Sequence, residues 1–133
     1  MRLPLPPAAL LAALCLAGPA LADFFQTPSG NVQCYGGGDF VDCEIIEAET
    51  APPVPRPLDC DLEWGRRFSV AATGEGAMPC YGDTVRGRGY PVLPYGSQAS
   101  FGAVTCFSEE RGLECVNPEG GGFLVSRRDQ RLY

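Results

Sequence analysis

Apolar and polar residues alternate over short stretches of this chain, and no stretch repeats apolar residues with the 3.6-residue period of a helix. Glycine and proline, with 17 and 13 residues, separate these stretches and mark turns between them. Short alternating segments bounded by turn residues are typical of β-structure. The pattern predicts strands over residues 31–35, 40–46, 67–72, 100–107, 113–116 and 122–126.

These segments predict an all-β fold. We expect a small, disulfide-stapled antiparallel β domain, either a sandwich or an open barrel, built from short hairpins. Residues 50–58 contain four prolines and predict a stiff, extended connector between the first hairpin and Cys60.

The stretch from residue 31 to residue 45 can be paired with itself as a hairpin. If Cys34 lies opposite Cys43, the period-two alternation of side chains places apolar residues and glycine on the cysteine face. These residues are Val32, Gly36, Val41 and Ile45. We therefore expect the cysteine face to be buried.

The same register determines the turn and the opposite face. The turn falls on Gly38 and Asp39, and glycine in the first central position predicts a type II′ turn. The opposite face is mostly polar and is where a function of this hairpin would lie; it carries Gln33, Tyr35, Asp42 and Glu44.

A second hairpin is predicted around Cys106 and Cys115, which repeat the nine-residue separation of the first pair. Direct pairing of these cysteines places Ser108 opposite Leu113 and the turn at residues 110–111. A turn with a G1 bulge at Gly112 would instead shift the register by one residue.

The N-terminus has the pattern of a secretory signal peptide. Arg2 supplies a positive charge, residues 8–17 are apolar, and residues 20–22 (Ala-Leu-Ala) form a small-residue cleavage site. The apolar run is shorter than the roughly 20 residues of a membrane span. Two alternatives are a retained anchor and a lipid-anchored Cys15, although Leu14 directly before it does not suit lipoprotein processing. We therefore predict a cleaved signal peptide over residues 1–22 and a single extracytoplasmic domain over residues 23–133, with no stable membrane span after cleavage.

Six cysteines remain after cleavage, and an even number in a short exported chain is typical of a disulfide framework. Sequence alone does not select one pairing, but the two hairpins favour Cys34–Cys43 and Cys106–Cys115 and leave Cys60–Cys80. The spacing matches neither a zinc site, which favours cysteines two to four residues apart, nor a C-x-x-C redox pair. We expect no metal and no cofactor.

The composition excludes several classes of function. Without Arg2, nine arginines face 16 carboxylates, a net charge of −7. This balance disfavours binding to nucleic acid and to anionic lipid surfaces. The sequence contains neither histidine nor lysine, which excludes histidine-dependent triads, histidine-ligated zinc and Schiff-base chemistry. We therefore predict that the protein is not an enzyme.

Two groups of residues remain as candidates for a site. The first is a candidate binding surface that consists of Trp64, Tyr81, Tyr90, Tyr95 and Arg127. The alternative is that the aromatic rings pack in the core. Glu44, Glu47 and Glu49 could supply the paired carboxylates of a glycosidase, although solvated loop charges are the simpler interpretation. Residues 82–84 (Gly-Asp-Thr) resemble part of an aspartic protease motif but occur once, so a turn is expected.

Several short motifs occur together along the chain. They are Thr27-Pro28-Ser29-Gly30-Asn31 followed by Cys34, Trp64-Gly65, Gly82-Asp83-Thr84, Tyr95-Gly96, and Gly121-Gly122-Phe123 through Ser126-Arg127. In this combination the chain resembles a family of short exported bacterial proteins of unknown function, over residues 24–133. The resemblance implies an extracytoplasmic bacterial protein and supports the cysteine framework. It implies no activity, substrate or catalytic residue.

These observations lead to three hypotheses. The first is a periplasmic or secreted, non-catalytic binding or envelope-associated module with a protein or glycan partner, and it should expose Trp64 or the tyrosines. The second is a secreted inhibitor-like or toxin-like disulfide protein, which should project a rigid loop, for example at residues 86–89. The third is a hydrolase, which should hold two carboxylates about 5–10 Å apart in a cleft.

Overall fold

The computed structural model describes residues 2–4 and 23–133. The predicted signal peptide, including Cys15, lies outside the described residues except for residues 2–4. Within the described part of the chain, no helix is long and apolar enough to cross a membrane.

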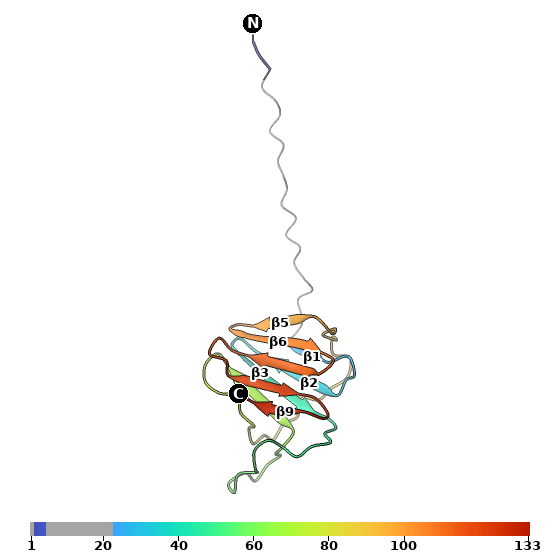
Figure 1. Cartoon of the computed structure of the whole chain (residues 1–133), viewed down its shortest axis with the longest axis vertical. Coiled ribbons are helices and arrows are strands. Elements are labelled where there is room, and N and C mark those ends of the chain that lie inside the picture. Colours follow the sequence, from blue (N-terminus) through green and yellow to red (C-terminus); the bar gives the residue numbers. More distant parts are fainter. Residues whose placement is uncertain (1, 5–22) are drawn as a thin grey trace.

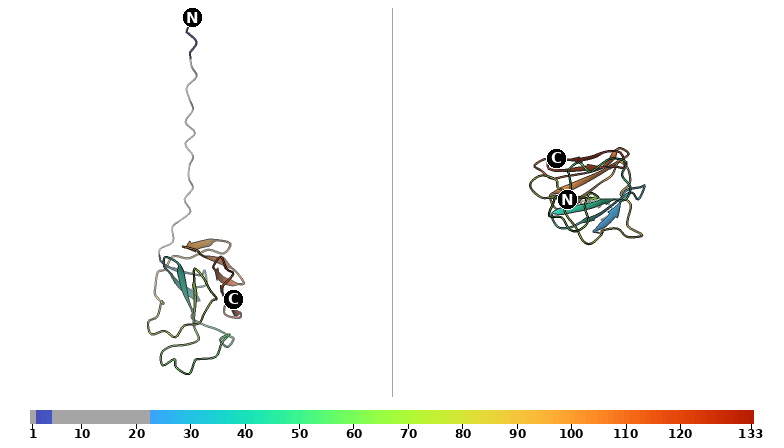
Figure 2. Two further views of the ribbon diagram at one scale, coloured as in Figure 1. Left: turned by 90° about the vertical axis from the view of Figure 1, so that its left-hand side faces the viewer. Right: turned by 90° about the horizontal axis from the view of Figure 1, so that it is seen from below.

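Within residues 23–133, nine strands form two antiparallel sheets that pack face to face as a sandwich (Figures 1 and 2). The first sheet has the order β1 (Phe24–Gln26), β2 (Val32–Gly36), β3 (Phe40–Ile45) and β4 (Arg67–Ala71). The second has the order β5 (Gln98–Phe101), β6 (Val104–Glu109), β7 (Gly112–Val116), β8 (Gly122–Val125) and β9 (Gln130–Leu132). The predicted all-β, disulfide-stapled fold is confirmed, and the sandwich is the correct alternative.

Both sheets are built around a hairpin that is closed by its own disulfide. Cys34–Cys43 joins β2 to β3, and Cys106–Cys115 joins β6 to β7, with Cα–Cα distances of 4.1 and 4.0 Å. All four cysteines are fully buried in one core that the two sheets share. The third disulfide, Cys60–Cys80, joins the two long connections that precede and follow β4. The structure thus contains the three pairs that the spacing favours.

Aromatic rings extend the two cysteine rows across the core. Phe68 on β4 lies beside Cys43, and Phe123 on β8 lies beside Cys115. The two phenylalanine ring centroids are 5.8 Å apart, and both rings are fully buried. This contact joins the sheets through the elements next to each hairpin.

The register predicted for the first hairpin is confirmed, but its turn type is wrong. Cys34 pairs with Cys43 and Gly36 pairs with Val41, so the cysteine face is buried as expected. Neither Gly38 nor Asp39 has a positive φ, which a type II′ turn would require at Gly38. The turn makes a tertiary contact instead, in which the Asp39 carboxylate accepts a hydrogen bond from the Ala103 N–H at 3.1 Å.

The second hairpin has the direct register without a bulge. Cys106 pairs with Cys115, Ser108 pairs with Leu113, and Glu109 pairs with Gly112. Residues 110 and 111 form the turn, so the alternative with a shifted register is wrong.

The strand predicted over residues 100–107 is in fact two strands. The chain reverses at residues 102–103 between β5 and β6. Gly102 has a φ of 58°, and a Cβ at this position would lie 2.0 Å from the Gly38 carbonyl oxygen. Glycine therefore allows both the left-handed backbone and the close approach of the first hairpin.

The remaining differences concern short elements at the sheet edges. The prediction omits the three-residue strands β1 and β9, and it misses the start of β5. The prediction also ends two residues before the end of β6 at Glu109, and the other strand boundaries differ by one residue or less. Strands of three residues are too short to show an alternation.

Removing one hairpin disulfide should destabilise the whole sandwich. We expect the double substitution Cys34→Ala/Cys43→Ala to lower the free energy of unfolding by about 3 kcal/mol, because it releases a loop constraint and leaves space in the core. Cys60–Cys80 closes a longer loop, but Cys60→Ala/Cys80→Ala should cost less, since Cys80 is exposed and the pair lies outside the sheets, so that its removal leaves little space in the core. Urea unfolding followed by circular dichroism measures both values, and the reverse order would contradict this account of the core.

Candidate functional site

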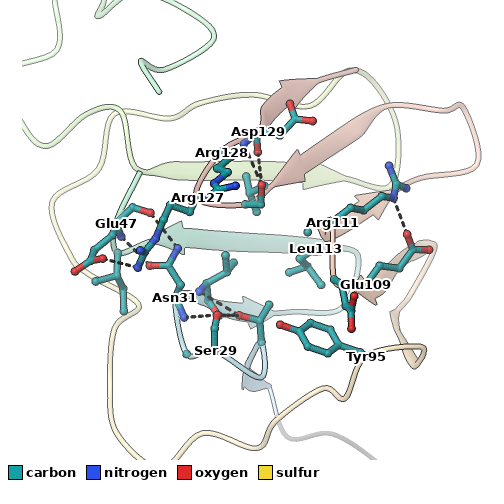
Figure 3. Close-up of a pocket in the computed structure, with 18 residues that line it drawn as sticks. Ser29, Asn31, Glu47, Tyr95, Glu109, Arg111, Leu113, Arg127, Arg128 and Asp129 are labelled. Carbon is teal, nitrogen blue, oxygen red and sulfur yellow. Dashed lines mark hydrogen bonds and ion pairs between the residues drawn. The ribbon is translucent and has the colours of Figure 1, made fainter. Parts of the chain in front are cut away.

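One end of the sandwich contains an open pocket of about 700 Å³ (Figure 3). Four chain segments from both sheets form it: the β1–β2 connection, the residues that follow β3, the β6–β7 turn and the β8–β9 connection. Tyr95, which precedes β5, completes the wall. The lining residues are Thr27, Ser29, Gly30, Asn31, Val32, Ile46, Glu47, Tyr95, Glu109, Glu110, Arg111, Gly112, Leu113, Val125, Ser126, Arg127, Arg128 and Asp129.

The β1–β2 connection is a tight turn whose shape follows from its sequence. The Thr27 N–H donates to the Val32 carbonyl at 3.0 Å, and the Gly30 N–H donates to the Thr27 carbonyl at 2.9 Å. Gly30 has a φ of 73°, which suits glycine at this point of a turn. The Ser29 hydroxyl accepts a hydrogen bond from the Asn31 N–H at 3.2 Å. These bonds fix one wall of the pocket.

Asn31 attaches this turn to the end of β3. Its amide nitrogen Nδ2 donates to the Glu47 carbonyl at 3.0 Å, and its oxygen Oδ1 accepts from the Glu47 N–H at 2.9 Å. Both ends of the amide are used in this contact, which indicates a positioning role for Asn31.

Charged side chains form the rim and connect the two sheets. Arg127 Nη2 lies 2.6 Å from the Glu47 carboxylate, and Arg128 Nε lies 3.4 Å from that of Glu49. On the other side of the opening, Arg111 Nε lies 2.6 Å from Glu109 (Figure 3). All of these side chains are substantially exposed, and exposed ion pairs contribute about 0–1 kcal/mol. Their charges can therefore exchange partners at little cost.

The interior of the pocket is apolar. Val32, Leu113 and Val125 are buried core residues that reach its floor, and Ile46 is half-buried. The side chain of Tyr95 is 48 % exposed and lies on the same side of the opening as Glu109, across from Arg127 (Figure 3). The pocket thus combines an apolar floor, one aromatic ring and a rim with both signs of charge.

The five residues predicted as a binding surface lie in different places. Tyr95 and Arg127 line the pocket, and the other three do not. Trp64 packs against the core, and the Tyr90 ring stacks on Phe24 with centroids 4.9 Å apart. Tyr81 lies under the Arg67 guanidinium, 4.2 Å from its ring centroid. Burial, and then the nearby Glu44 carboxylate, raise the pKa of Tyr81.

The interpretation of Glu44 as a solvated loop charge is wrong. It lies on the outer face of β3 and is 1 % exposed. Its carboxylate accepts hydrogen bonds from Arg67 Nη2 at 3.2 Å, the Thr84 hydroxyl at 2.6 Å and the Val85 N–H at 3.0 Å. Residues 82–84 therefore form the turn that brings the following segment onto the sheet, and Glu44 holds that segment in place.

This segment covers part of the predicted functional face of the first hairpin, at Gln33 and Glu44, whereas Tyr35 and Asp42 on the same face are half-buried. The Gln33 amide donates to the Gly87 carbonyl at 3.0 Å and accepts from the Gly87 N–H at 3.2 Å. Residues 86–89 thus lie against the sheet, and they do not form the projecting loop expected of an inhibitor. Among the described residues, no group of three or more cysteine, aspartate or glutamate side chains could hold a metal ion.

The sequence prediction missed most of the pocket residues. Thr27, Ser29 and Asn31 occur in the sequence analysis only as part of a motif, and Arg111 and Arg128 are not among the predicted site residues. Their position follows from the topology, because in antiparallel sheets alternate connections meet at the same end of the strands. The strand order places the turns around residues 110 and 127 at the same end of the second sheet, and the turn around residue 29 meets them at the pocket.

Replacing Glu44 should test the role of this buried carboxylate. We expect Glu44→Gln to lower the free energy of unfolding by about 3 kcal/mol, because Arg67 would keep a buried charge without its counter-ion. Glu47→Gln makes the same change in an exposed ion pair and should cost less than about 1 kcal/mol. Urea unfolding compares the two variants, and equal losses would contradict the assignment.

Comparison with known proteins gives one match. The model of a family described as "Family of unknown function (DUF6636)" matches residues 7–133. No curated protein and no solved structure is significantly similar to the chain.

Proposed function

Because the chain belongs to the DUF6636 family of unknown function, its activity is inferred from its own residues, and we propose a non-catalytic binding protein that works outside the cytoplasm. Three disulfides in a chain of 133 residues are compatible with an oxidising compartment. The signal peptide predicted over residues 1–22 supports a periplasmic or secreted location.

The observation that carries the proposal is the pocket at the end of the sandwich. Loops at the ends of a rigid sandwich are a common place for binding sites, because the sheets hold them in position. The volume of about 700 Å³ lies within the range of about 300–1,000 Å³ that ligand pockets have. Residues from both sheets form its wall, so the fold as a whole positions it.

The lining favours a peptide segment of a protein partner over a glycan. The half-buried Ile46 offers apolar contact for one side chain of such a segment, and the buried Val32, Leu113 and Val125 lie beneath the pocket floor. Three arginines and four carboxylates on the rim can pair with charges of either sign. Tyr95 is the single aromatic residue among the lining residues, which gives little area for stacking of sugar rings.

The bonding of the rim carboxylates supports binding without catalysis. Glu47, Glu109 and Asp129 each pair with an arginine, at 2.6, 2.6 and 2.8 Å. Carboxylates held in this way serve as hydrogen-bond acceptors for arginine. We therefore assign these groups to recognition.

A peptide-display selection on the purified, disulfide-bonded protein tests the proposal. Selected peptides should bind in isothermal titration calorimetry and should be recovered with unchanged mass. Tyr95→Ala and Arg127→Gln should each weaken binding about tenfold or more, which corresponds to about 1.4 kcal/mol. Arg88→Gln removes the same charge from an exposed position outside the pocket and should leave the affinity unchanged.

Three results would overturn the proposal. The first is that no displayed peptide binds, and the second is that binding is equally sensitive to Arg88→Gln. Cleavage of the bound peptide would contradict the non-catalytic assignment while leaving the position of the site intact.

A further inference from the structure

The connection between β3 and β4, residues 46–66, lines the pocket only at its start. Its tip carries a second feature, a pair of exposed leucines. This connection appears as the green segment that extends beyond the sheets in Figure 1. Leu58 is fully exposed at 105 %, and Leu62 is 56 % exposed. A single exposed leucine is common on protein surfaces and has no meaning by itself. The turn that carries Leu58 is unusually constrained, and this constraint suggests a role for the leucine.

The tip of the connection is a tight turn. The Cys60 N–H donates to the Pro57 carbonyl at 3.2 Å, which leaves Leu58 and Asp59 at the two central positions. Prolines at positions 55 and 57 restrict the backbone that leads into the turn. The Cys60–Cys80 disulfide attaches the end of the turn to the following connection.

Arg56 closes this turn from within. Its Nε and Nη2 atoms donate to the Cys60 carbonyl at 3.2 and 2.8 Å, and Nη2 also donates to the Leu62 carbonyl at 2.7 Å. A charged side chain is thus used to satisfy backbone groups of its own loop. Together with the prolines and the disulfide, it constrains the backbone of the turn that carries Leu58. A rigid loop loses little conformational entropy when it binds, so such a loop is suited to present an anchor residue.

The charges next to the two leucines indicate what could bind them. Asp59, Asp61 and Glu63 are exposed and flank Leu58 and Leu62 in the sequence. Three carboxylates disfavour contact with an anionic lipid surface. They favour a protein surface in which arginine or lysine side chains surround an apolar pocket.

We propose that residues 55–63 are a docking loop for a protein partner, with Leu58 inserted into an apolar pocket that basic side chains border. Leu62 supplies additional apolar contact, and the acidic side chains contact the basic border. This proposal does not depend on the peptide-binding pocket, since none of residues 55–63 lines it.

The test measures how the fluorescently labelled, disulfide-bonded protein binds to the cell-surface fraction of the organism that makes it. We expect saturable binding that protease treatment of the surface removes. Leu58→Asp should weaken it at least tenfold, whereas Val92→Asp, at an exposed apolar residue elsewhere, should not change it. Arg56→Met keeps Leu58 but removes the internal hydrogen bonds, and it should weaken binding by a smaller factor.

Further measurements separate this proposal from its alternatives. Increasing salt should weaken binding, because the charged border would be screened. Arg127→Gln should leave this binding intact, which distinguishes the loop from the pocket. The proposal is overturned if the wild type shows no saturable binding, if Leu58→Asp has no effect, if Val92→Asp has the same effect, or if protein-free vesicles of phosphatidylethanolamine and phosphatidylglycerol bind the protein equally well.

Discussion

The two hairpin disulfides are the constraint on which the rest of the structure depends. Each joins residues that lie directly opposite each other, so each fixes the register of two neighbouring inner strands in its sheet. Because side chains alternate, fixing the cysteines inside also fixes which residues face outward. Phe68 and Phe123 then continue the buried rows and bring the two sheets together. The two sheets obtain a single shared core in this way.

The two sheets differ in what covers their outer faces. The first sheet is covered by the segment after Cys80, which the buried Glu44 and the amide of Gln33 hold in place. The second sheet is covered by its own side chains: Leu124 is 1 % exposed and lies between its cross-strand neighbours Glu114 and Arg131. The segment after Cys80 is therefore used on one sheet, and the short turns of both sheets, together with the start of the β3–β4 connection and Tyr95, form the pocket at the end of the sandwich.

The sequence predicts those features of the structure that neighbouring residues determine. Fold class, the register of the first hairpin and the favoured cysteine pairs follow from alternation and spacing, whereas the sequence leaves two alternatives for the register of the second hairpin. The predicted turn type at Gly38 is wrong, because this turn makes a hydrogen bond to Ala103, which is distant in sequence. The burial of Glu44 could not be predicted either, since its partners Thr84 and Val85 are 40 and 41 residues away. Tyr95 and Arg127 were named as candidates from their residue type, but their meeting in one pocket depends on the strand order of both sheets.

The central claim is that the open end of the sandwich binds a peptide segment. Nuclear magnetic resonance of the ¹⁵N-labelled, disulfide-bonded protein, with and without a selected peptide, tests it most directly. The account predicts that the largest shift changes of the backbone amides occur at residues 27–31, at Tyr95 and at residues 126–129. Changes confined to residues 82–90 or to residues 55–63, with residues 27–31 and 126–129 unaffected, would contradict it.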